Sequence, residues 1–299
     1  MPTEHLEEVA VLESTRMTRL VIDKPAFESE LEVVTNERRL VVDNSPDGLL
    51  SERLFANAFE VHPYGWPTVG WMKDLEGMEP VDATRFYKHF YAPNNATIYV
   101  VGDVEPDRVL DLIAKHYGHL SRSEPQRPIR ALEPKQTLQK REDLTLAMSA
   151  DRVLIGFKIP EYTHEDIPAL LVLDAAFTSG RTGRLQRALR DGGWVADVSS
   201  YIMPLKDPSL WEFALQCRPG LSAKDVEKVF WRELERVVEE GISQGEVQMG
   251  IAQWRSFTWS QMVGVDGKAD FLGWLCTHTG SHLDGVNRMR SMESITLED

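Results

Sequence analysis

Apolar residues recur at the spacing of an amphipathic helix through most of the first 120 residues. Between His5 and Leu20, the positions of Leu6, Val9 and Leu12 lie on one side of such a helix, with acidic residues between them. The same periodicity predicts further helices in this part of the chain, at residues 26–43, 50–59, 81–91 and 106–117.

The first half also contains two breaks and one strand signal. Residues 44–48 (Asn-Ser-Pro-Asp-Gly) have the composition of a loop. Pro93 and the two asparagines after it are expected to end the helix at 81–91 and to form a turn. Residues 96–101 are a short apolar run rich in β-branched side chains, which predicts a strand.

Residues 121–141 interrupt this pattern, because they combine Pro125, Pro128 and Pro134 with many charges and few large apolar side chains. Such a composition is typical of an interdomain linker. We therefore expect an α+β protein with two domains, each an antiparallel sheet layered with helices. The boundaries that we predict are residues 1–120 for the first domain, 121–145 for the linker and 146–299 for the second domain.

Beyond the linker the hydrophobic pattern starts again. Short apolar runs predict strands, and longer stretches with helical periodicity predict helices. The predicted strands are 152–159, 195–202 and 210–217, and the predicted helices are 167–177, 223–240 and 244–261, with another helix beginning at 185–189.

The net charge of −14 limits the kinds of partner that the chain can bind. Binding to nucleic acid or to an anionic membrane needs a basic surface, so we expect neither. No apolar run approaches the length of a membrane span, and we expect a soluble protein of either the cytoplasm or the periplasm. A basic or neutral unfolded peptide is compatible with this charge. The two cysteines, Cys217 and Cys276, are too few for a disulfide framework and are interpreted as reduced, buried side chains.

Glu30 and Glu37 are the first candidates for chemistry. They are seven residues apart, close to two helical turns, so both side chains project from nearly the same face. Val33, Val34 and Leu40 lie along or beside that face, which predicts carboxylates next to packed apolar surface. A buried carboxylate needs a cation, a hydrogen-bond donor or a metal, whereas two glutamates on an exposed helix form only a solvated stripe. The spacing alone does not decide between these alternatives.

The histidines give a weaker metal signal. His278 and His282 are four residues apart, but no acidic residue lies between them and Gly280 disfavours a stable helix there. We interpret both as structural. The segment His62-Pro-Tyr64 is interpreted as an ordered turn that packs between layers.

A series of short motifs, in the same order and at the same spacing, resembles segments of the pitrilysin/insulinase family of zinc metallopeptidases. The resemblance covers nearly the whole chain, and it implies a clam-like pair of homologous α+β domains. The motifs occupy residues 4–7, 12–17, 27–30, 33–39, 62–65, 90–97, 101–104 and 184–190.

The resemblance also implies roles for particular residues. Enzymes of this family hold zinc with two histidines of an inverted motif, His-x-x-Glu-His, and with a glutamate from a later helix. Glu37 matches that later glutamate, and Glu30 matches a second acidic residue that supports the metal site without binding the ion. Arg190 matches an arginine that contacts the substrate backbone, whereas the tyrosine that accompanies it in the family is replaced here by Asp197.

The chain departs from the family in one important respect, because it contains no His-x-x-Glu-His motif. The closest string, from His5 to Val9, has valine in place of the second histidine. One glutamate without a histidine cannot make a tight zinc site, since catalytic zinc needs three protein ligands. We therefore expect no catalytic residue in this chain, and we expect zinc only in a complete enzyme.

Two interpretations follow from this departure. In the first, the chain is a portion of a zinc metalloendopeptidase, truncated at both ends, that supplies the glutamate ligand and the second substrate-binding domain. A missing N-terminal segment or a homologous subunit would then complete the site. In the second, the chain is a non-catalytic partner subunit, or a peptide-binding interaction protein, of the same fold.

Overall fold

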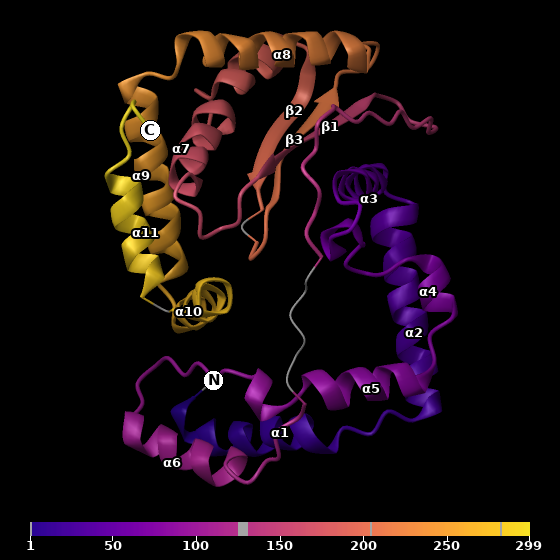
Figure 1. Cartoon of the computed structure of the whole chain (residues 1–299), viewed down its shortest axis with the longest axis vertical. Helices are drawn as coiled ribbons and strands as arrows, with labels where there is room; N and C mark the ends of the chain where they lie inside the picture. The colour runs from indigo at the N-terminus through magenta and orange to yellow at the C-terminus, as the bar shows by residue number, and fades with distance from the viewer. Residues whose placement is uncertain (1, 125–130, 204, 282) are drawn as a thin grey trace.

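A computed structural model describes residues 2–124, 131–203, 205–281 and 283–299 of the chain. The helices of the first half lie along the lower and right sides of the view in Figure 1. The second half lies at the top and left, and it contains the three-stranded sheet, which is the only sheet of the described residues.

The described part of the first half is helical, with connecting loops. The helices predicted from the hydrophobic periodicity all form, with small shifts of their ends. The elements in chain order are η1 (Thr3–His5), α1 (Leu6–Arg19), α2 (Lys24–Arg38), η2 (Arg39–Asp43, a π-helical turn), α3 (Pro46–Ala58), η3 (Pro63–Gly65), α4 (Met72–Glu76), α5 (Pro80–Phe90), η4 (Pro93–Asn95) and α6 (Pro106–Tyr117).

Side-chain caps set the start of the two helices that matter most for the site. The Asp23 carboxylate accepts a hydrogen bond from the backbone N–H of Ala26 at the start of α2. At the start of α3, the Ser45 hydroxyl accepts a hydrogen bond from the N–H of Gly48 at 3.1 Å. The predicted loop at 44–48 is therefore wrong over most of its length: serine at the cap followed by Pro46 begins a helix instead.

The strand predicted at residues 96–101 does not form. Ala96 has an extended backbone, with φ −121° and ψ 142°, but no strand of the described residues pairs with this segment. A β-strand needs a neighbour to satisfy its N–H and C=O groups, and local sequence does not supply one. The α+β class holds for the chain as a whole, whereas the sheet expected in the first domain is absent from the described residues.

The second half contains the sheet and the remaining helices. All three strands are antiparallel, with β3 in the centre and β1 and β2 on either side of it. The predicted strands and helices form here as well. The elements are β1 (Arg152–Ile159), α7 (Ile167–Thr178), η5 (Gln186–Asp191), β2 (Val195–Ile202), β3 (Ser209–Cys217), α8 (Ala223–Glu240), α9 (Gln244–Gln261), α10 (Val265–Thr279) and α11 (Asp284–Glu293).

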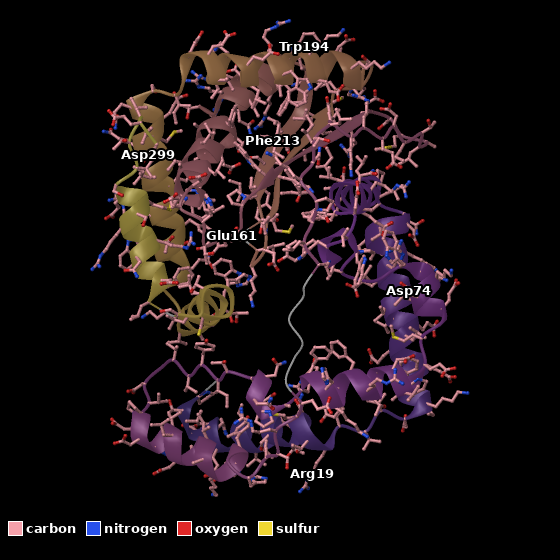
Figure 2. The ribbon with its side chains drawn as sticks, viewed as in Figure 1. Arg19, Asp74, Glu161, Trp194, Phe213 and Asp299 are labelled. Carbon is pink, nitrogen blue, oxygen red and sulfur yellow. The ribbon has the colours of Figure 1, made fainter. Side chains whose placement is uncertain are left out.

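The main hydrophobic core lies between one face of this sheet and the helices of the second half. Alternate residues of β3, namely Trp211, Phe213, Leu215 and Cys217, belong to this core. Phe213 has an exposed fraction of 0%, and Figure 2 shows it among the side chains that fill the second half. Burial of this aromatic and aliphatic surface is the main source of stability for the second half.

The opposite face of the sheet meets the first half. Leu210 points to the face opposite the core residues of β3, because successive side chains of a strand alternate between faces. It is buried against Ala58 and Phe59 at the end of α3. The turn at His62 packs into the same region, as the sequence predicted, since His62 is buried and its Nδ1 accepts a hydrogen bond from the N–H of Tyr64. This contact places α3 over the β1 side of the sheet.

Glu133, in the segment predicted as a linker, is anchored to the first half. Its carboxylate accepts hydrogen bonds from the N–H groups of Glu60, Val61 and His62 at 2.8–3.0 Å. Burial raises the pKa of Glu133, but these three donors outweigh it and, together with Lys158, lower the pKa to about 2. The carboxylate therefore stays ionised and holds the linker against the end of α3.

A second contact between the halves involves α10. Gly273 of this helix lies against the ring of Tyr99. Both cysteines are free, as expected, although Cys276 is only partly buried. The extended segment at 96–101 therefore contacts a helix of the second half rather than a strand.

Candidate functional site

Helix α2 carries both Glu30 and Glu37, as the spacing predicted. Two helical turns separate them, so they share one face of the helix. Arg38, the last residue of α2, is buried and projects about 100° around the helix from its neighbour Glu37. The π-helical turn η2 continues the helix directly after Arg38, and turns of this kind occur frequently at functional sites.

Arg38 holds α2 in a defined orientation. Its Nη1 donates hydrogen bonds at 2.7 Å to Glu52 Oε2 of α3 and at 2.7 Å to the carbonyl of Gly70. The Glu52 carboxylate is buried too, with an exposed fraction of 7%, and its hydrogen bond with Arg38 raises the pKa of the guanidinium. A paired, buried charge of this kind fixes the rotation of α2 about its own axis.

The face that carries the two glutamates is uncovered. Val33 and Leu40 flank the carboxylates, and their exposed fractions are 57% and 73%. Of the three apolar residues that the prediction placed beside the carboxylates, Val34 is partly buried. The prediction of a packed apolar surface is wrong for Val33 and Leu40, which are exposed. We call the residues Glu30, Val33, Glu37 and Leu40 the α2 strip.

Neither carboxylate of the α2 strip has a partner. Glu30 and Glu37 make no hydrogen bond or ion pair with any residue that the structure describes. Within the same residues, no group of three or more His, Cys, Asp or Glu side chains could hold a metal ion. The chain by itself does not fit a zinc ion, because a tight zinc site needs three or four protein ligands and α2 offers one pair of carboxylates.

Arg190 lies elsewhere, in η5 of the second half. Its side chain is exposed and makes no hydrogen bond or ion pair with the described residues. Asp197, at the position of the family tyrosine, lies on β2 next to a β-bulge between Val195 and Asp197. The bulge leaves Asp197 exposed while Val198 remains in the core. The structure thus places Arg190 and Asp197 in the second half, and no recorded contact connects them with the α2 strip.

His278 has a structural role, in agreement with the sequence. Its Nδ1 contacts the carbonyl of Trp274 at 2.8 Å, and its ring is stacked on Trp274 at 4.3 Å between centroids. Gly280 has φ +79° and ends α10 directly after Thr279. His282 lies outside the described residues.

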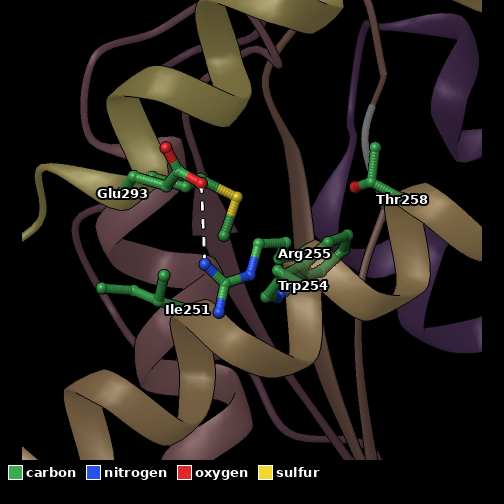
Figure 3. A pocket seen from close by; sticks show the side chains of 6 residues that line it. Ile251, Trp254, Arg255, Thr258 and Glu293 are labelled. Carbon is green, nitrogen blue, oxygen red and sulfur yellow. Dashed lines mark ion pairs between the residues drawn. The ribbon is translucent and has the colours of Figure 1, made fainter.

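A small hollow lies between two helices of the second half. It is bounded by α9 and α11, has a volume of about 10 Å³ and is crossed by the Arg255–Glu293 ion pair at 3.8 Å, as Figure 3 shows. A space of that size holds about one water molecule, so it is a gap between two packed helices and not a ligand site.

A second hollow, between α1 and α5, is about 740 Å³ and mostly apolar. Tyr87 connects its two helices, because the hydroxyl donates to the carbonyl of Arg16 at 2.7 Å and accepts from the N–H of Leu20 at 3.3 Å. Phe86 beside it is 56% exposed. The sequence reasoning missed this hollow, since helical periodicity identifies an apolar face but not whether another element covers it.

Helices of the described residues are either too short or too polar to cross a membrane. This finding agrees with the absence of a long apolar run in the sequence.

Comparisons with known proteins connect this structure to one family. The family model described as peptidase M16 inactive domain matches residues 79–253. Zinc protease PqqE from Helicobacter pylori is 32% identical over 250 residues, which cover 81% of this chain and 56% of the relative. An uncharacterized zinc protease of Mycobacterium leprae is 29% identical over 230 residues, covering 74% of this chain and 50% of the relative. The chain thus spans about half the length of the curated relatives it matches.

Solved structures show the same fold. The crystal structure of a protease from Helicobacter pylori has a TM-score of 0.90 and 27% identity, covering 100% of this chain and 73% of that chain. A peptidase M16 inactive domain from Pseudomonas fluorescens has a TM-score of 0.84 at 17% identity, covering 99% of this chain and 70% of the other. These matches confirm the α+β class and the resemblance that the short motifs indicated.

Proposed function

The chain belongs to the M16 peptidase family, whose inactive-domain model matches more than half of it, and we propose that it is the non-catalytic portion of a zinc metalloendopeptidase. The complete enzyme hydrolyses peptide bonds in this proposal. The chain contributes Glu37 as one zinc ligand, Glu30 as a support for the metal site, and a second half that binds the peptide substrate through Arg190.

The observation that carries the proposal is the α2 strip. Arg38 and Glu52 fix the orientation of α2, and yet the adjacent face leaves two carboxylates and two large apolar side chains uncovered. Apolar side chains at 57% and 73% exposure gain free energy when another surface covers them. A segment that packs there would bring its own side chains next to Glu37.

The histidines of the zinc site must then come from that segment, since the chain has no His-x-x-Glu-His motif. Either a portion of the same protein or a homologous subunit could supply it. In both cases we propose two units in this chain, residues 1–120 and 146–299, connected by the linker at 121–145. The first unit carries the α2 strip and the second carries the substrate-binding surface.

The acidic character of the chain supports a peptide as the substrate. A net charge of −14 favours basic or neutral unfolded polypeptides and disfavours nucleic acids. The second candidate function is that of a partner subunit without catalysis, which binds peptide or supports an active homologue. The absence of the zinc motif from the sequence favours it.

Zinc retention separates the two functions. We would mix the chain with a homologous subunit that carries a His-x-x-Glu-His helix, dialyse the mixture and measure zinc per complex. Glu37→Gln should abolish metal retention, because an amide oxygen carries no charge to balance the cation. Glu30→Gln should weaken zinc binding by roughly 10- to 100-fold, as changes to groups around the ligands do.

Glu32→Gln is the matched control, because Glu32 is exposed on α2 but lies well away from the α2 strip. It should leave the zinc content unchanged. We expect the chain alone to retain no stoichiometric zinc. Full retention by Glu37→Gln in the mixture would contradict the ligand role of Glu37 and leave the partner-subunit function. Zinc on the isolated chain would contradict the proposal in another way, because it would require a metal site other than the one at Glu37.

A further inference from the structure

The sheet face that points away from the main core is only half covered. Helix α3 packs against β1 and against Leu210 of β3. On the β2 side of the same face, the side chains of Asp197, Ser199 and Tyr201 are exposed, as is Ala214 of β3. We call this part of the sheet the open face.

Glu212 lies at the border between the covered and the open parts. It is in the middle of β3, opposite Gly156 of β1 and opposite Tyr201 of β2. Since Leu210 and Ala214 are its neighbours two residues away on β3, all three side chains share one face. Glu212 is half-buried there, at the edge of the space that Tyr201 and Ala214 leave uncovered.

The Glu212 carboxylate has no partner among the described residues, neither a hydrogen bond nor an ion pair. Burial alone raises its pKa to about 7. The nearest basic residue on this face of the sheet is Lys158 of β1, and it is already engaged. Its Nζ lies 3.4 Å from Glu133 Oε1 and 5.2 Å from the ring centre of Phe59.

A comparison with Asp174 shows that this situation is unusual within the same domain. Asp174 is half-buried like Glu212, and burial raises its pKa, but its Oδ1 accepts hydrogen bonds from the Ser200 hydroxyl and from Trp211 Nε1. Asp174 is therefore satisfied by the fold. Glu212 has no such donor, and its half-buried carboxylate is open to a group from outside the described residues.

The surroundings of Glu212 fit one kind of ligand. A carboxylate removed from water binds an ammonium or guanidinium group through charge-assisted hydrogen bonds. Tyr201, 57% exposed and directly opposite, offers an aromatic face for the aliphatic stem or the charge of a long basic side chain. Ala214 is small, so this part of the face has room for such a side chain.

We propose that Glu212 and Tyr201 form a subsite that binds a lysine or arginine side chain of the peptide substrate. The proposal rests on the proposed function, since it names the substrate class of the second half. Asp197 lies on the same open face and extends its negative charge along β2, toward a second basic residue of an extended peptide.

Peptide binding to the full chain tests this subsite directly. The probes are a fluorescent decapeptide with two lysines and the same peptide with norleucine in place of lysine. Fluorescence anisotropy should show the lysine peptide binding roughly 10-fold more tightly, the effect of one charge-assisted hydrogen bond. Glu212→Gln should remove most of that advantage and leave the affinity for the norleucine peptide unchanged.

Glu239→Gln is the control variant. It removes the same charge from an exposed position on α8, so it should not alter either affinity. A merely structural role for Glu212 predicts a different result: the variant would then lose stability, and both peptides would bind less tightly. We expect Glu212→Gln to unfold at an equal or higher urea concentration, because it removes a half-buried charge that has no partner.

The two proposals fail in different ways. If the lysine and norleucine peptides bind wild type and Glu212→Gln with equal affinity, the subsite is wrong and the peptide-binding function stands. If neither peptide binds, the subsite and the peptide-binding role of the second half are both wrong. Zinc retention through Glu37 is measured as metal content and does not depend on Glu212, so it tests the metal role separately.

Discussion

The two halves of the chain differ in how they bury their apolar residues. In the second half, Phe213, Phe230 and Leu189 are 0% exposed in one continuous core. In the described part of the first half, the most buried hydrophobic residue, Leu75, is 4% exposed, while Val21 is 78% exposed. Both halves have apolar helix faces, but among the described residues only the second half has a sheet against which to pack them.

This difference indicates how each half is stabilised. The second half has the layered arrangement of a domain that closes its own core. The first half depends more on helix caps, on the Arg38–Glu52 pair and on contacts such as that of Tyr87 with Arg16 and Leu20. Its exposed apolar faces, among them the α2 strip, are suited to contacts with another segment or subunit.

The largest effect that tests this comparison is expected from Phe213→Ala. Phe213 contacts the rings of four other aromatic residues and is 0% exposed, so the variant leaves a cavity. Its free energy of unfolding should fall by about 3–5 kcal/mol, measured by urea denaturation. Phe86→Ala, at 56% exposure in the first half, should cost less than about 1 kcal/mol. If Phe86→Ala lowered the free energy of unfolding as much as Phe213→Ala, the first half would have a core of its own.

A smaller and more local effect is expected from Arg38→Met. The variant leaves the buried Glu52 carboxylate without its cation, at a cost of about 3 kcal/mol. Because the pair lies in the first half, hydrogen exchange should accelerate in α2 and α3, while β3 stays protected. Arg39→Met is the control, since Arg39 is exposed and its side chain donates a hydrogen bond to Asn36 Oδ1, at 3.0 Å, and to no other described residue. Loss of protection in β3 as well would show that the halves unfold as one cooperative unit.

The smallest effect concerns acid stability at the contact between the halves. Glu133 has a pKa lowered from 4.5 to about 2, so it stabilises the folded state fully above about pH 4.5. That contribution, at most about 3 kcal/mol, is lost as the pH falls from 4.5 toward 2. Glu133→Gln should reduce the pH dependence of unfolding between pH 4.5 and 2, and should accelerate amide exchange at residues 60–62 at neutral pH. An unchanged acid transition would contradict the anchoring role.

Part of the fold could be predicted from local signals. Helical periodicity located α1, α2, α5 and α6, and apolar runs located the three strands of the second half. The loop predicted at 44–48 was wrong because serine followed by proline is also a helix start, and only the hydrogen bond from Gly48 to Ser45 distinguishes the two. The strand predicted at 96–101 was wrong because pairing depends on a neighbour that local sequence does not specify.

The candidate site, like the fold, could be predicted only in part. The helical repeat alone placed Glu30 and Glu37 on one face, because that relation depends only on residues within α2. Their exposure could not be predicted, since it depends on what lies beside Val33 and Leu40. The ligand role of Glu37 and the substrate role of Arg190 come from the family resemblance and stay predictions.

Glu212 shows the limit of sequence reasoning most clearly. In the sequence it is a charged residue in the apolar strand at 210–217, and alternation places it on the face opposite Phe213. The sequence by itself determined the helices, the strands and the relations between neighbours on one element, because these follow from a fixed repeat. Tertiary structure alone decided which faces are covered and which charges have partners. Helix α3 covers the β1 side of the sheet, and Lys158 pairs with Glu133. Glu212 has no partner among the described residues. Burial and pairing depend on residues distant in the chain, and a local pattern does not encode them.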